Sequence, residues 1–200
     1  MASKTLIVGL GDSTTAGTPG FYSPLEEPPD GVGDPESQYC YWMMKGHPQW
    51  IVLNRGVNGQ RSDEILSRFA RDVLAERPKV VIILAGVNDI YQGRTADSVK
   101  RNLEAMYQLA ERGGIVPLAA TILPYNTARV KEREAIRDVN RWVESASRAP
   151  GRLFCDTNLA VRDGDDPDFL ASSRDGLHPN VAGYRSMGEA LSTTLENAGY

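Results

Sequence analysis

The chain has 200 residues, of which 41% are hydrophobic and 24% are charged. These proportions are ordinary for a globular protein and exclude collagen-like, coiled-coil and wholly disordered chains. The net charge of −4 is spread along the sequence with no basic stripe, so we expect no binding to nucleic acid. No stretch approaches the ~20 apolar residues that span a bilayer, so no membrane insertion is expected. The length predicts a single domain over 1–200.

Cysteine and histidine are too scarce for a dedicated metal site. Cys40 and Cys155 can form at most one disulfide, and only His47 and His178 accompany them. We therefore expect no metal. The apolar run at the N-terminus is too short for a secretory signal, so the sequence as written predicts a cytoplasmic protein. A secreted or periplasmic location would require that an export signal had been trimmed away.

Short apolar segments alternate with longer segments of helical period, which is typical of parallel strands joined by crossover helices. The fold class predicted is α/β, a doubly wound sheet of about five parallel strands with helices on both faces. The predicted strands are Thr5–Leu10, Ile51–Asn54, Val80–Ala85, Ile115–Thr121 and Leu153–Asp156. The predicted helices are Ser62–Glu76 with Ser62 as N-cap, Thr95–Arg112, Thr127–Arg148 and Asn180–Asn197.

One segment does not fit this alternation. Residues 18–38 contain five prolines and three glycines, which predicts a long loop. Loops of this length are uncommon in compact domains and are usually binding loops or disordered. The segment follows the first strand, so it either shapes a substrate site or is a surface insertion.

Polar residues and glycines follow the predicted strands, where an open parallel sheet binds its ligands. Ser13 follows the first strand, Gly56 the second and Asn88 the third. Asp175 and His178 lie in the loop after the fifth strand. Since parallel strands end at one edge of the sheet, we expect these side chains to meet there.

These residue types are the parts of an acyl-transfer site. A serine hydroxyl becomes a nucleophile when a neighbouring histidine removes its proton, so Ser13 and His178 are the candidates. Asp175, three residues before His178, can hold the imidazole in the required tautomer. Pro179 is expected at the first position of the last helix, where it would fix the place of His178.

The oxyanion of a tetrahedral intermediate needs hydrogen-bond donors already directed at it. The backbone N–H groups of Gly56 and Ser13 and the side-chain amide of Asn88 are the expected donors. Tyr91 and Tyr125 each follow a strand end, and they either line a substrate pocket or pack as aromatic rings at its rim.

The sequence resembles the SGNH hydrolases, also called GDSL esterases and lipases, on four separated blocks. They are GDST with Ser13, NRGVNG with Gly56, GVND with Asn88, and DGLHP with Asp175 and His178. The resemblance implies a three-layer flavodoxin-like fold, hydrolysis of a small-molecule ester or thioester, and no cofactor. Thr14 stands where the family name has leucine. The oligomeric state is left open.

Several activities remain compatible with these residues: a carboxylesterase, a thioesterase, a lysophospholipase or a carbohydrate acetylesterase. A flavodoxin-like module that binds phosphate or sugar is the non-enzyme alternative. The motif GxxxxGK is absent, and GxGxxG fails at Thr14, so the sequence favours the esterase.

Overall fold

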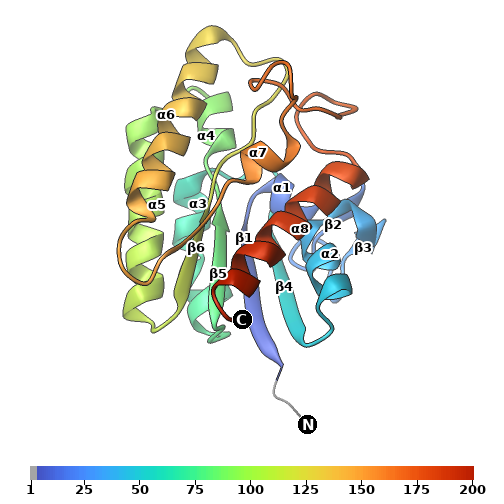
Figure 1. The fold of residues 1–200 in the computed structure, drawn as a ribbon, viewed down its shortest axis with the longest axis vertical. Coiled ribbons are helices and arrows are strands. Elements are labelled where there is room, and N and C mark those ends of the chain that lie inside the picture. The colour runs from blue at the N-terminus through green and yellow to red at the C-terminus, as the bar shows by residue number, and fades with distance from the viewer. Residues whose placement is uncertain (1–3) are drawn as a thin grey trace.

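Five parallel strands form the central sheet of the computed structural model, which describes residues 4–200 (Figure 1). Their order across the sheet is β4-β1-β5-β6-β7, as in flavodoxin-like folds. This confirms the predicted fold class, and each predicted strand lies within two residues of an observed one. The strands are β1 (Thr5–Gly11), β4 (Trp50–Gly56), β5 (Val80–Leu84), β6 (Val116–Ala120) and β7 (Leu153–Cys155).

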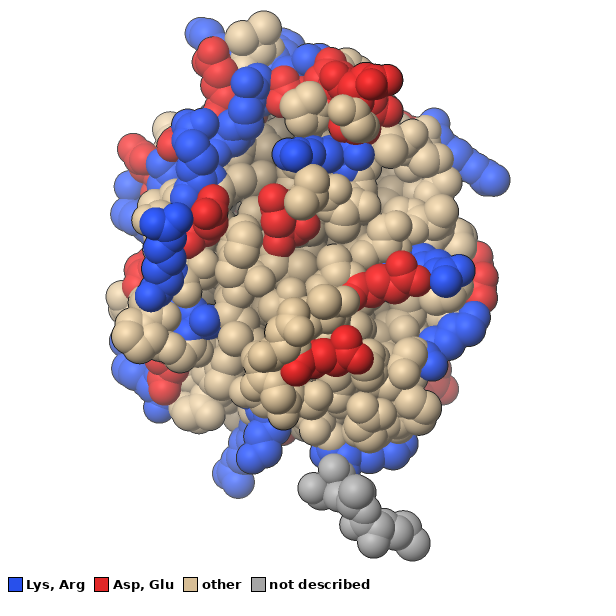
Figure 2. Space-filling model, in the orientation of Figure 1, with Lys and Arg blue, Asp and Glu red and all other residues tan. Residues whose placement is uncertain are grey.

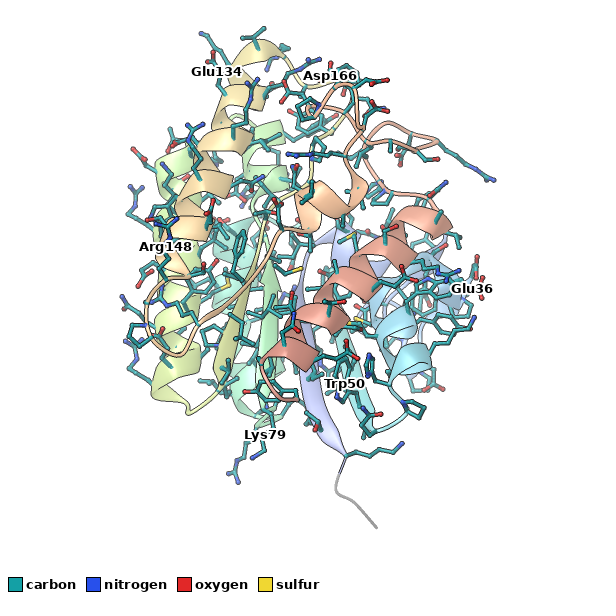
Figure 3. All side chains as sticks on the ribbon, viewed as in Figure 1. Glu36, Trp50, Lys79, Glu134, Arg148 and Asp166 are labelled. Carbon is teal, nitrogen blue, oxygen red and sulfur yellow. The ribbon has the colours of Figure 1, made fainter. Side chains whose placement is uncertain are left out.

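Helices cover both faces of the sheet. From β1 the chain moves first to one side, to β4, and later to the other, to β5, β6 and β7, and right-handed crossovers in the two directions place their helices on opposite faces. Helices α2 and α8 pack against each other on one face, and α3 and α5 do so on the other (Figure 1). The side chains between helices and sheet form one hydrophobic core (Figure 3). The helices are α1 (Ser13–Ala16), α2 (Tyr39–Gly46), α3 (Ser62–Ser67), α4 (Val87–Tyr91), α5 (Ala96–Arg112), α6 (Val130–Ala146), α7 (Thr157–Val161) and α8 (Val181–Asn197).

The starts of three helices differ from prediction, and α6, predicted from Thr127, begins at Val130. Arg61 occupies the N-cap position of α3, and Ser62 is instead the first helical residue, because Asp89 accepts hydrogen bonds from both its N–H and its hydroxyl. Asn180 caps α8 through its side chain, so Pro179 precedes the helix and does not begin it. The helix predicted over 62–76 ends at Ser67 and continues as a π-helical turn over Ala70–Leu74.

The Pro/Gly-rich segment 18–38 is more ordered than a loop prediction implies. It folds as a two-stranded antiparallel sheet, β2 (Phe21–Tyr22) with β3 (Val32–Gly33), followed by a 3₁₀ turn over Pro35–Ser37. Phe21 is buried, and Tyr184 of α8 donates a hydrogen bond of 2.8 Å to the Thr18 carbonyl. These contacts hold the segment against the body of the domain.

Basic and acidic side chains are intermixed on the face shown in Figure 2. No helix within residues 4–200 is long and apolar enough to cross a membrane. Cys40 and Cys155 are both buried and are free thiols in the described chain.

Candidate active site

Ser13 lies at the turn between β1 and α1, where the sheet ends. The preceding Asp12 caps α1, since its side chain accepts a hydrogen bond of 3.0 Å from the N–H of Thr14. Ser13 is therefore the first helical residue, and no hydrogen bond within residues 4–200 uses its N–H. Its side chain is largely buried but faces His178.

A continuous hydrogen-bond chain joins Ser13 to the loop that precedes α8. His178 Nε2 lies 2.8 Å from Ser13 Oγ, and its Nδ1 lies 2.7 Å from Asp175 Oδ2. The other oxygen, Asp175 Oδ1, accepts from the backbone N–H groups of His178 at 2.8 Å and Leu177 at 2.9 Å. The structure thus brings together three residues that are up to 165 positions apart.

The two carboxyl groups near Ser13, those of Asp175 and Asp12, have pKa values that are shifted in opposite directions. Burial by itself would raise the pKa of Asp175, but its hydrogen bonds from the His178 side chain and from two backbone N–H groups hold that pKa well below its usual range. Asp175 is therefore ionised beside the imidazole. Complete burial raises the pKa of Asp12 to about 7, despite its hydrogen bond from Thr14.

Asn88 lies at the start of α4, at the end of β5 and next to the strand that carries Ser13. Its Nδ2 donates one hydrogen bond of 3.0 Å to the Gln60 carbonyl. The second hydrogen on Nδ2 has no partner among the described residues. An amide with one anchored and one free N–H can donate to a ligand.

Gly56 departs from the sequence expectation. Its N–H donates to Asn54 Oδ1 at 3.0 Å, so it is occupied within its own strand. A Cβ at this position would lie 2.1 Å from the Ala16 nitrogen and 2.6 Å from the Ala16 Cα. The glycine is therefore required by the close approach of α1, and the geometry does not support the expected role of Gly56 as an oxyanion donor.

Gly59 is a donor that the sequence analysis missed. It has a φ of +73° and open space around its Cβ position, and no hydrogen bond within residues 4–200 uses its N–H. Its loop is bound on one side to the end of β1, since Val57 N–H donates to the Gly11 carbonyl, and on the other to Asn88 through Gln60. The sequence signal was the Asn58-Gly59 pair, a typical turn with positive φ.

Tyr91 and Tyr125 pack edge to face, with ring centroids 5.6 Å apart. Tyr125 is 1% exposed, and its hydroxyl is buried with no hydrogen-bond partner in the described chain. Tyr91 is 55% exposed at the end of the helix that carries Asn88. Aromatic packing therefore describes Tyr125, and Tyr91 alone presents its ring to solvent.

A cavity of about 450 Å³ opens beside His178. Its wall combines apolar surface with polar side chains, among them Asp34 and Ser37 from the Pro/Gly-rich segment and Ser172 and Arg174 from the histidine loop. The segment 18–38 therefore borders the candidate site.

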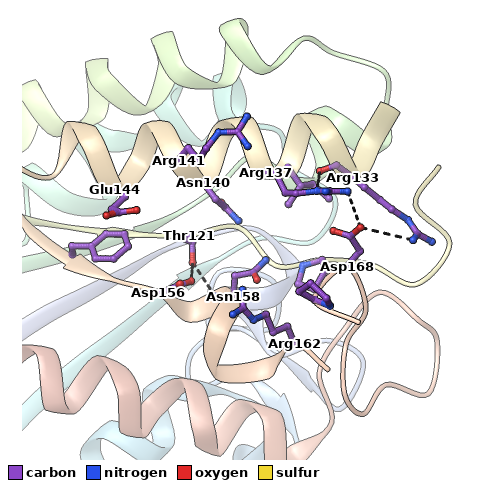
Figure 4. Close-up of a pocket in the computed structure, with 14 residues that line it drawn as sticks. Thr121, Arg133, Arg137, Asn140, Arg141, Glu144, Asp156, Asn158, Arg162 and Asp168 are labelled. Atoms are coloured by element: carbon purple, nitrogen blue, oxygen red, sulfur yellow. Dashed lines mark hydrogen bonds and ion pairs between the residues drawn. The ribbon is translucent and has the colours of Figure 1, made fainter. Parts of the chain in front are cut away.

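A second cavity, between α6 and α7, contains neither Ser13 nor His178 (Figure 4). Asp168 lies at its edge and accepts a hydrogen bond of 2.8 Å from Arg137, with Arg133 facing the same carboxylate (Figure 4). Asp168 thus pairs with two of the arginines that line this cavity.

Three curated relatives align with this chain. A Bacillus subtilis uncharacterized lipoprotein, YqeF, is 28% identical over 113 residues, which is 46% of either protein. An acetylxylan esterase from Geobacillus stearothermophilus is 24% identical over 70% of this chain and 69% of its own length. Esterase TesA from Pseudomonas aeruginosa is 27% identical over 72% of this chain and 69% of its own length.

The fold also matches a solved Desulfitobacterium hafniense structure, assigned to the G-D-S-L family of lipolytic proteins, with a TM-score of 0.79 and 27% identity over 96% of this chain and 99% of that one. The family model described as GDSL-like lipase/acylhydrolase matches residues 10–186. The chain therefore belongs to the GDSL-like lipase/acylhydrolase family and is a carboxylic ester hydrolase.

Proposed function

We propose that the protein cleaves its ester through an acyl-enzyme intermediate on Ser13, with His178 as general base and Asp175 as the group that orients the imidazole. The observation that carries this proposal is the pair of contacts at His178, 2.8 Å to Ser13 Oγ and 2.7 Å to Asp175 Oδ2. Both distances suit direct proton transfer or orientation through a hydrogen bond.

The chemical steps follow from these contacts. Ser13 Oγ bonds to the acyl carbon while its proton passes to His178 Nε2, and the carbonyl oxygen becomes an oxyanion. The C–O bond to the alcohol then breaks, and the alcohol leaves with the proton from Nε2. A water molecule repeats the sequence on the acyl-enzyme and releases the carboxylic acid. Asp175 stays ionised throughout and stabilises the imidazolium.

The oxyanion is stabilised in this proposal by the N–H groups of Ser13 and Gly59 and by the free N–H of Asn88. All three donors are unoccupied in the described chain, whereas the N–H of Gly56 is not. Each donor that is already held in place at the site of developing charge lowers the barrier by about 2.7–4 kcal/mol.

The alcohol part of the substrate is proposed to be polar and hydroxyl-bearing. The cavity beside His178 is bordered by hydroxyl, carboxylate and guanidinium groups from Ser37, Ser172, Asp34 and Arg174. These groups can hydrogen-bond the hydroxyls of a sugar, while the apolar part of the wall can pack against its ring. That one relative is named an acetylxylan esterase supports an acetylated carbohydrate as the substrate.

The substitution Ser13→Ala tests the nucleophile. It is expected to abolish hydrolysis of p-nitrophenyl acetate and to leave the far-ultraviolet circular dichroism spectrum unchanged. Retained turnover would remove Ser13 from the mechanism.

Substrate class is tested separately on the unaltered enzyme. We expect faster hydrolysis of acetylated xylo-oligosaccharides than of p-nitrophenyl octanoate or an acyl thioester. A preference for the octanoyl ester or the thioester would contradict the polar-alcohol proposal and leave the role of Ser13 intact.

A further inference from the structure

The buried guanidinium of Arg68 contacts three of the segments that build the candidate site. Arg68, at the end of α3, is 7% exposed. Its Nη2 donates to the Gly11 carbonyl at 2.7 Å, and its Nη1 donates to the Arg55 carbonyl at 2.9 Å. These carbonyls lie at the ends of β1 and β4, two neighbouring strands that lead to Ser13 and to the Gly59 loop.

The third contact leads toward Asn88. Arg68 Nε donates to Gln60 Oε1 at 2.7 Å, and the backbone carbonyl of Gln60 accepts from Asn88 Nδ2 at 3.0 Å. Gln60 thus has its side chain fixed by Arg68 and its main chain fixed to Asn88. A displacement of Gln60 would turn the Asn88 amide, since the anchored hydrogen sets the direction of the free one.

The orientation of Arg68 is itself fixed. Its Nη1 also donates to Asp72 Oδ2 at 2.7 Å, and the side chains of both residues are almost fully buried. A charge-assisted pair inside the protein has one geometry, because leaving either charge unpaired there is costly. Arg71 shares the same carboxylate from outside, through Nε at 2.6 Å, but its side chain is 69% exposed and it has no bond to a strand end.

We propose that Arg68 and Gln60 are positioning residues for catalysis, which together hold the Asn88 amide and the Gly59 loop in the orientation that receives the oxyanion. This inference rests on the proposed function, since the positioning matters only if Asn88 and Gly59 donate to the oxyanion. Preorganised donors lose much of their effect when displaced, and a misplacement of about 1 Å costs up to about 100-fold in rate.

The decisive variant is Gln60→Leu, which removes the side-chain acceptor, keeps the backbone carbonyl for Asn88, and alters a partly exposed loop residue. We expect kcat for p-nitrophenyl acetate to fall about 10- to 100-fold with little change in KM, because the donors act mainly in the transition state. Gln60→Glu, which restores an acceptor for Arg68 Nε, is expected to recover most of the lost rate. Arg71→Gln is the matched control, expected to leave kcat unchanged.

A double-mutant comparison separates positioning from a general structural effect. In an Asn88→Ala background, Gln60→Leu is expected to cost little more, because the group it orients is already gone. An equal cost in both backgrounds, or a wild-type kcat for Gln60→Leu alone, overturns the proposal while leaving the roles of Ser13 and Asn88 in place. If Asn88→Ala itself keeps full activity, the oxyanion role of Asn88 fails first, and the positioning role falls with it.

Discussion

The most direct test of the hydrogen-bond chain is Asp175→Asn, because the structure dictates how the new amide must sit. Asp175 Oδ1 accepts from the N–H groups of Leu177 and His178 and from the Ser173 hydroxyl, at 2.8–3.1 Å. The amide oxygen of asparagine must take this position, since an NH₂ group there would face two backbone donors. The NH₂ group is then directed at His178 Nδ1.

That orientation reverses the tautomer of the imidazole. His178 Nδ1 must accept from the new amide, so the single proton of the neutral ring moves to Nε2, which faces Ser13 Oγ and can no longer take its proton. We expect kcat to fall about 10⁴-fold, or about 5.4 kcal/mol at 1.36 kcal/mol per factor of ten. The fold should persist, because the backbone N–H groups keep their acceptor.

The assay is steady-state hydrolysis of p-nitrophenyl acetate, with thermal unfolding as the check on folding. Ser173→Ala serves as the comparison, since it removes one hydrogen bond of 3.1 Å to the same carboxylate and leaves the imidazole contact unchanged. Its loss should stay below about tenfold, near the net value of a single hydrogen bond. A folded Asp175→Asn enzyme with a kcat within tenfold of wild type would refute the assigned role of Asp175.

Alanine at Gly56 and alanine at Gly59 should both cost stability, but only the change at Gly56 should abolish most of the activity. Gly56→Ala places a Cβ 2.1 Å from the Ala16 nitrogen, so α1 must shift; we expect a loss of about 1–3 kcal/mol in unfolding free energy and of most activity, whereas an active, stable variant would contradict the packing. Gly59→Ala has open space and keeps its N–H, so only its φ of +73° costs stability, about 1–2 kcal/mol, and a complete loss of kcat would count against this picture. In urea unfolding, the stability of Asp12→Asn relative to wild type should increase as the pH is raised from 5 to 8. Burial raises the folded pKa of Asp12 from 3.8 to about 7, so the stability that the carboxyl group contributes is complete below pH 3.8 and is lost as the pH rises through 7; a difference independent of pH would contradict the burial argument. Activity is expected to survive EDTA, because no step uses a metal, and a loss reversed by added cation would overturn that mechanism.

The sheet could be predicted well from the sequence because most of its strands are short, continuous apolar segments. β5 reads Val-Val-Ile-Ile-Leu and is buried along its whole length, as a strand covered on both faces must be. Short helices such as α1 and α4 escaped prediction, since four or five residues carry no period. Within residues 4–200, α1 is capped by the Asp12 side chain, whereas α4 has no side-chain cap and is bonded to the neighbouring segment through Asn88 and Asp89.

Some residues of the candidate site could likewise be predicted from the sequence and others could not. Ser13, Asn88, Asp175 and His178 could be found because side-chain chemistry is written in the sequence. The choice between Gly56 and Gly59 as oxyanion donor could not be made from the sequence, because neighbouring groups decide whether a backbone N–H is free. The side chain of Asn54, on the same strand, accepts a hydrogen bond from the Gly56 N–H, and nothing in NRGVNG marks that pairing.

The contacts of Arg68 suggest why a buried charge is retained below a site whose chemistry does not require it. An apolar side chain of similar volume would pack there, and buried ion pairs often stabilise no better than such a replacement. However, the Gly11 and Arg55 carbonyls at the ends of β1 and β4 both accept hydrogen bonds from Arg68, and an apolar residue could not donate to them. A planar guanidinium satisfies both and still has Nε for Gln60. The need to hold several loop ends at once therefore explains the arginine better than its contribution to stability does.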